Sequence, residues 1–230
     1  MKALFLLLPL TLLATCDDVN RTTAKVIGDG VAAQTSAFQK ATDARDWRSI
    51  ANATVIDCTA EPEACGKLHG MRANACLILA MDQRTNPRAA CPAPTAEVTE
   101  WLDCADREYA AAAPMLAADK RGGAAANRAN ALYCKAESKT VVGGQAEAMG
   151  AEQTGTQAGD AIGLLWAARG AVFQARAGAG TPATRCDALR RAQALATRGA
   201  ALGNPTIAAA YTGVRGDIGA LRPSIPGCTL

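Results

Sequence analysis

The sequence has few of the side chains on which catalysis, base stacking and metal binding depend. Aromatic residues make up 4% of its 230 residues, and His69 is the single histidine. Nucleophilic catalysis through a histidine would have to use His69 alone, which we interpret as a packed or helix-terminal residue. The sequence also has no Cys-x-x-Cys pair and no glycine-rich phosphate loop. We therefore predict no catalytic residue, no metal and no cofactor.

Long apolar runs and concentrated charge are missing as well. Beyond residue 16, no stretch reaches the roughly 18 apolar residues expected of a membrane-spanning helix. The 24 basic and 21 acidic residues are interspersed, with a net charge of +3. Without a basic patch or interleaved aromatic residues, we predict no nucleic-acid partner.

Half of the residues are apolar, and many of these are alanines, as in the runs at 110–113 and 208–210. Alanine favours helix, and no alternating β-branched run indicates a strand. The sequence therefore predicts an all-α fold of antiparallel helical hairpins. We expect about seven helices, over residues 36–58, 62–81, 95–121, 124–138, 162–173, 182–202 and 207–221. The glycine-rich stretch 143–159 is expected to be a loop or a poorly ordered helix.

The N-terminus is typical of an export signal. Lys2 precedes an apolar segment over residues 3–14, which is too short to span a bilayer. The following Leu13-Ala14-Thr15-Cys16 resembles the lipobox of bacterial lipoproteins, which implies a lipid on Cys16 and a membrane anchor in the cell envelope. Ordinary secretion is the alternative. We predict a signal peptide over residues 1–15, a tether over 16–35 and a disulfide-rich helical domain over 36–230.

The nine cysteines are an odd number for an exported protein. If Cys16 carries lipid, eight remain for four disulfides: Cys58, Cys65, Cys76, Cys91, Cys104, Cys134, Cys186 and Cys228. We expect Cys58 to pair with Cys65 across a short helical hairpin. Cys186 and Cys228 are the only two in the C-terminal third, so they are candidates for a second pair. Spacing leaves the remaining four unassigned.

A four-residue motif occurs twice, as Arg72-Ala73-Asn74-Ala75 and Arg128-Ala129-Asn130-Ala131. Each copy follows a predicted helix that carries a tryptophan, Trp47 or Trp101, and a weaker third copy begins at Trp166. This arrangement resembles a tetratricopeptide-like α-solenoid, although its period near 55 residues is longer than that family's. An irregular helical bundle is the alternative. In such a solenoid Asn74, Asn130, Arg72 and Arg128 could face a concave groove and bind peptide. The alternative, which we favour for the two asparagines, is a structural role in which they bond neighbouring helix termini.

These features predict a lipid-anchored envelope protein that acts as a protein-interaction module, with an envelope protein or peptide as its partner. The alternatives are an envelope hydrolase with unidentified carboxylates and a small-ligand binder. Pairs such as Glu61 with Glu63, or Glu97 with Glu100, are candidate carboxylates, but their places near helix starts suit ordinary first-turn acids.

Overall fold

The computed structural model describes residues 14–86 and 89–230, with side chains described from residue 28 onward, and within these ranges no strand occurs. The predicted all-α fold is confirmed. The helices are α1 (Ala14–Asp43), α2 (Trp47–Asn52), α3 (Pro62–Asp82), α4 (Ala96–Ala112), α5 (Ala118–Glu137), α6 (Gln145–Ala158), α7 (Ala161–Gln174), α8 (Pro182–Ala201) and α9 (Ala208–Leu221). Two 3-10 turns, η1 (Pro205–Ile207) and η2 (Arg222–Ser224), flank α9.

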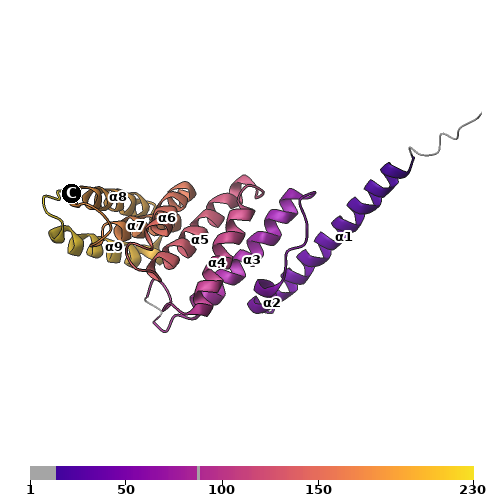
Figure 1. The fold of residues 1–230 in the computed structure, drawn as a ribbon, viewed down its shortest axis with the longest axis horizontal. Coiled ribbons are helices and arrows are strands. Elements are labelled where there is room, and N and C mark those ends of the chain that lie inside the picture. Colours follow the sequence, from indigo (N-terminus) through magenta and orange to yellow (C-terminus); the bar gives the residue numbers. More distant parts are fainter. Residues whose placement is uncertain (1–13, 87–88) are drawn as a thin grey trace, which may run out of the picture.

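The helices follow one another along the molecule in chain order (Figure 1). From α3 to α9, each helix packs against the next one in the sequence. The odd-numbered helices also contact their second neighbours, in the pairs α1–α3, α3–α5, α5–α7 and α7–α9. The odd-numbered helices therefore form one continuous layer, and the even-numbered helices cover its other side.

Several helix starts follow from capping chemistry that is visible in the sequence. Thr95 caps α4 by accepting the amide of Val98 at 3.1 Å. Asp160 does the same for α7, since its carboxylate accepts the amide of Gly163 at 2.6 Å. Pro62 and Pro182 occupy the first turns of α3 and α8, where a missing N–H costs nothing.

The first helix is longer than expected. Residues 16–35, predicted as a tether before a helix at residue 36, lie within α1, which is helical from residue 14. Val31 and Phe38 are buried, and the Gln34 side chain bonds the carbonyl of Thr54 and the amide of Ile56. Only this C-terminal part of α1 lies against the body, and the rest projects away from it (Figure 1). Two buried side chains within residues 28–43 leave little apolar periodicity to detect there.

The stretch 143–159 is also more ordered than expected, because α6 occupies most of it. Its glycines permit close packing and do not mark a loop. A Cβ on Gly155 would lie 2.9 Å from the amide nitrogen of Ala167 on α7. A Cβ on Gly170 of α7 would in turn lie 2.6 Å from the carbonyl oxygen of Ala148. Backbone thus meets backbone between α6 and α7.

Four disulfides stabilise the described part of the chain: Cys76–Cys104 joins α3 to α4, and each of the other three ties a non-helical segment to a helix. Cys58 pairs with Cys65 and Cys186 with Cys228, as predicted, and the two pairs that spacing left open are Cys76–Cys104 and Cys91–Cys134. The first pair forms in a different setting from the one expected. Helix α2 ends at Asn52, and Cys58 lies in the irregular segment 53–61 that leads into α3.

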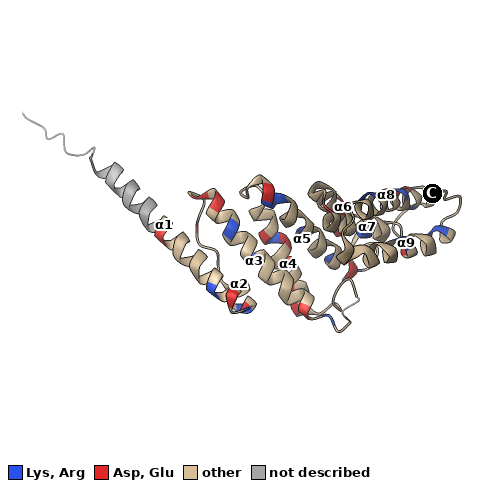
Figure 2. Ribbon diagram, turned by 180° about the vertical axis from the view of Figure 1, so that it is seen from behind, with Lys and Arg blue, Asp and Glu red and all other residues tan. Residues whose placement is uncertain are grey.

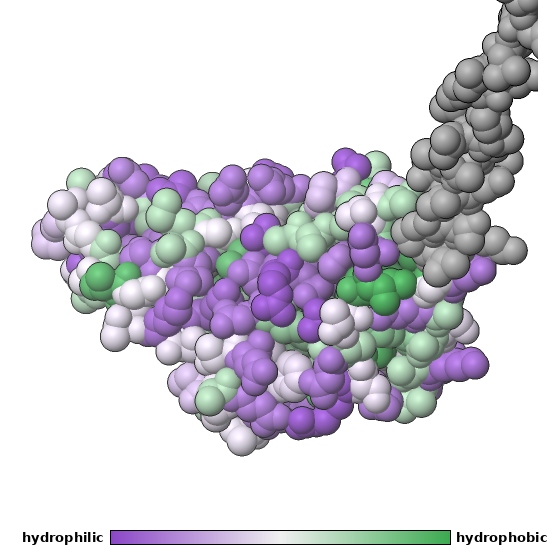
Figure 3. Space-filling model, turned by 45° about the vertical axis from the view of Figure 1, so that its right-hand side comes forward, coloured by the Kyte–Doolittle hydropathy of each residue, from purple (hydrophilic) through white to green (hydrophobic). Residues whose placement is uncertain are grey.

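Basic and acidic residues are both spread along the described helices (Figure 2). On the face in Figure 3, hydrophilic residues are interspersed with apolar ones, and the most hydrophobic residues form small separate patches. No helix in residues 14–86 and 89–230 is long and apolar enough to cross a membrane.

Candidate functional site

A hollow with a mixed lining lies on the layer of odd-numbered helices, and we call it the groove. It has a volume of about 900 Å³ and is bounded by α1, α3 and α5, with one residue from α4. Met71, Leu116 and several alanines give it an apolar wall. Its full lining is Thr35, Glu61, Pro62, Glu63, Ala64, Lys67, Gly70, Met71, Asn74, Tyr109, Leu116, Ala117, Lys120, Gly123, Ala124 and Asn127. Apolar walls with a few convergent polar groups are typical of binding sites.

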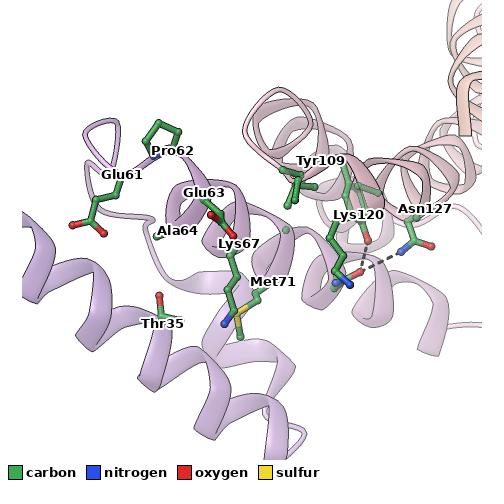
Figure 4. Close-up of a pocket in the computed structure, with 16 residues that line it drawn as sticks. Thr35, Glu61, Pro62, Glu63, Ala64, Lys67, Met71, Tyr109, Lys120 and Asn127 are labelled. Carbon is green, nitrogen blue, oxygen red and sulfur yellow. Dashed lines mark hydrogen bonds between the residues drawn. The ribbon is translucent and has the colours of Figure 1, made fainter.

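A hydrogen-bonded triad joins three helices at the end of the groove nearest α5 (Figure 4). The Tyr109 hydroxyl donates to the amide oxygen of Asn74 at 2.5 Å, and the amide nitrogen of Asn127 donates to the same oxygen at 3.3 Å. Burial raises the pKa of Tyr109 well above its usual value, so this hydroxyl remains a donor at neutral pH. Among the described residues, the amide nitrogen of Asn74 has no acceptor, which leaves it available to a ligand.

Charged groups enter the groove from both walls. Lys67 comes from α3 and Lys120 from α5, while Glu61 and Glu63 lie toward the start of α3 (Figure 4). Lys120 contacts Asp119 at 3.2 Å, a pair whose side chains are mostly exposed. Lys67 makes no ion pair within the part of the chain that the structure describes. A ligand with acidic groups would meet two ammonium groups in this part of the groove.

Two glycines leave room in the groove. A Cβ built on Gly70 of α3 or Gly123 of α5 would have no other atom within 4 Å. Each therefore borders open space, where a side chain would project without displacing a neighbour. A ligand can approach the helix backbone closely at these points.

The four residues predicted from the repeated motif have divided roles. Asn74 lines the groove, but Asn130 does not, and lies on α5 with its amide oxygen 3.5 Å from the sulfur of Cys134. Arg72 donates to Glu108 at 2.8 Å and to the carbonyl of Ala51. Arg72 of α3 therefore links this helix to α2 and α4 through hydrogen bonds. Asn74 is the motif residue that borders the groove.

The second arginine of the motif acts in the same way as the first. Arg128 donates to Asp106 of α4 at 2.9 Å, and Lys135 donates to the other oxygen of that carboxylate at 2.9 Å. Burial alone would raise the pKa of Asp106, but these hydrogen bonds and charges hold it below its ordinary value. Both motif arginines thus bind acids of α4 from opposite sides. The third motif copy is out of phase, because Trp166 lies on α7 of the odd-numbered layer, whereas Trp47 and Trp101 lie on α2 and α4.

Sequence reasoning missed most of the groove. Asn127, three residues before Asn130, reaches Asn74 because α3 and α5 approach each other on this layer. Tyr109 has no distinguishing pattern in the sequence, and helix packing brings its hydroxyl to Asn74. The one sequence signal for the groove was the polar residue Asn127, which directly precedes the second copy of the repeated motif.

A second polar cluster surrounds Glu108, whose side chain is 5% exposed. The carboxylate contacts Nδ1 of His69 at 2.7 Å, Arg72 at 2.8 Å and Arg107 at 3.4 Å. A buried carboxylate is tolerated when it is paired in this way. The other acids considered from the sequence are placed differently: Glu97 accepts from Arg48 at 2.7 Å on the surface.

No protein-family model matches this chain, and no curated protein or solved structure matches it either. What the protein does has therefore to be inferred from the groove and from the N-terminal sequence. Cys16, the residue predicted to carry lipid, lies where no side chain is described.

Proposed function

We propose that this protein is a lipid-anchored cell-envelope protein whose helical domain holds a peptide segment of an envelope partner in the groove. The groove is the observation that carries the proposal. It combines an apolar wall, the hydrogen-bonded triad of Asn74, Tyr109 and Asn127, and two lysines on the continuous helix layer. Four disulfides support a location outside the cytoplasm, where cysteine pairs oxidise and only a dedicated dithiol reductant opens them.

The lining indicates the chemistry of the partner segment. Apolar side chains of the segment would pack against Met71 and Leu116, and an acidic side chain would lie between Lys67 and Lys120. The free amide nitrogen of Asn74 would donate to a main-chain carbonyl. The hydrogen bonds from Tyr109 and Asn127 fix the Asn74 amide before binding, which reduces the entropy lost in the complex.

The experiment fills the groove without disturbing the fold. Peptides are selected from a displayed random library on the full chain, and the dissociation constant of the best peptide is measured by calorimetry. Gly70→Leu and Gly123→Leu place a side chain in open space at the groove. We expect each to weaken peptide binding at least about tenfold, which corresponds to about 1.4 kcal/mol.

The matched control is Gly216→Leu on α9, which also faces open space but lies away from the groove. It should bind the peptide as the unmodified chain does, and circular dichroism should show equal helix content in all variants. Selected peptides should contain apolar and acidic residues. Peptides that bind equally well to the filled and unfilled grooves would refute the proposal.

A further inference from the structure

Outside the groove, the described residues include a cluster of three side chains that could ligate a metal ion. The sulfurs of Cys58 and Cys65 and a ring nitrogen of His69 all lie within 4.8 Å of one another. The two sulfurs form a disulfide in this structure, and both cysteines are buried. Cys65 and His69 are four residues apart on α3, so their side chains lie on the same face of the helix.

We propose that reduction of the Cys58–Cys65 disulfide turns this cluster into a zinc site, with two cysteine thiolates and the His69 imidazole as ligands. The disulfide form blocks the site, so metal binding depends on the redox state. Two thiolates and one imidazole are ligands that Zn²⁺ prefers, and a water would complete the tetrahedron.

The chemistry balances with a dithiol as reductant. The dithiol becomes a disulfide, and its two electrons and two protons convert the Cys58–Cys65 bond into two thiols. Zn²⁺ then displaces both thiol protons to solvent. The resulting site, with two thiolates, a neutral imidazole and a divalent cation, has no net charge, which suits its burial.

The geometry allows the change. Thiolates on a tetrahedral zinc ion lie about 3.8 Å apart, given Zn–S bonds of about 2.3 Å, so the two sulfurs must move apart once their bond is reduced. Cys65 and His69 are fixed on α3, whereas Cys58 belongs to the irregular segment 53–61. Cys58 can therefore move without breaking a helix.

The surroundings of His69 also favour a metal ligand. The Glu108 carboxylate contacts Nδ1 at 2.7 Å, so an Nδ1–H that donates to it leaves the lone pair on Nε2. Carboxylate–histidine pairs of this kind orient the imidazoles of zinc sites. Arg72 pairs with the same carboxylate, so it offsets the charge of Glu108.

The test uses Co²⁺ as a spectroscopic probe, without oxygen and on the full chain. One variant keeps the other disulfides intact: Cys58→His cannot form the first disulfide, and it supplies an imidazole in place of the thiolate. We expect Cys58→His to bind Co²⁺ without reductant and to show thiolate-to-cobalt charge transfer with tetrahedral ligand-field bands. The unmodified oxidised chain should show neither.

Two controls make the result decisive. Adding His69→Gln to Cys58→His should weaken Co²⁺ binding at least about tenfold, since a ligand is lost. In the fully reduced chain, replacing Cys58 and Cys65 with serine should abolish the tetrahedral spectrum, whereas the same change at Cys186 and Cys228 should preserve it. Circular dichroism confirms that each sample is folded. A folded Cys58→His chain without the spectrum, or unchanged affinity after His69→Gln, would overturn the proposal.

Discussion

The carboxylate of Glu108 joins α3 and α4 deep in the core, where it accepts from Arg72 and contacts His69. Replacing it with glutamine removes the charge that Arg72 faces and keeps the shape. We expect Glu108→Gln to lower the free energy of unfolding by about 3 kcal/mol, because a buried charge loses its partner. Urea unfolding monitored by circular dichroism measures this loss.

Glu97→Gln is the matched control for this change. Glu97 also pairs with an arginine, but the side chains of Arg48 and Glu97 are 59% and 45% exposed. Water screens such a pair, so the stability should change little. Equal losses in the two variants would show that the Glu108 cluster contributes no more than a surface ion pair.

Asp106 predicts a dependence of stability on pH. Burial works against its charge, but hydrogen bonds from Lys135 and Arg128 outweigh this and lower its pKa in the folded state. The group therefore stabilises the fold fully above its unfolded pKa, about 3.9, and this contribution is lost as pH falls through the lower folded value. Asp106→Asn should flatten the stability curve in that acidic range. Asp119→Asn, at an exposed position, should leave the curve as it is.

At the scale of elements, the contact of α6 with α7 depends on glycine. A methyl group on Gly155 would meet the backbone of α7 at Gly163 and Ala167, which cannot move aside without shifting the helix. We expect Gly155→Ala to destabilise the protein by about 1–3 kcal/mol, as overpacking does. Thermal unfolding by calorimetry measures this effect. Gly216→Ala on α9, with open space around it, should instead be neutral or stabilise by up to about 1 kcal/mol.

Helix starts that depend on local signals could be predicted from the sequence, whereas helices that depend on packing could not. The starts of α3, α4 and α8 follow from Pro62, Thr95 and Pro182, because caps and N-terminal prolines act locally. For α6 the sequence left a loop and a poorly ordered helix open, because Gly155 is compatible with a loop until its neighbour on α7 is known. The extent of α1 was missed because, among its described side chains, only Val31 and Phe38 are buried.

The groove residues, too, could be predicted from the sequence only in part, because the groove forms between helices. The repeated motif drew attention to Asn74, which lies on the groove and bonds to two neighbouring helices, and its binding role stays a prediction. Its equivalent Asn130 lies elsewhere, and Asn127 makes the contact across helices. Which turn of α5 reaches α3 is decided by helix packing, and that depends on contacts between residues far apart in the sequence.

At the scale of the whole molecule, α1 connects the predicted lipid attachment site with the groove. Its 30 residues span about 45 Å, and Thr35 near its C-terminal end lines the groove. A lipid at Cys16 would therefore place the groove away from the membrane surface, at the far part of a helical spacer. Such a distance suits a partner that approaches from the side.

The anchor itself is tested by the intact mass of the natively processed protein. We expect a chain that begins at Cys16 and carries a diacylglyceryl group, with Cys16→Ser moving the protein from the membrane fraction to the secreted or soluble fraction. Reduction should add eight hydrogens, two for each of the four disulfides. An unmodified N-terminus would remove the anchor and leave a secreted groove protein, because the groove depends on α1, α3 and α5 and not on the lipid.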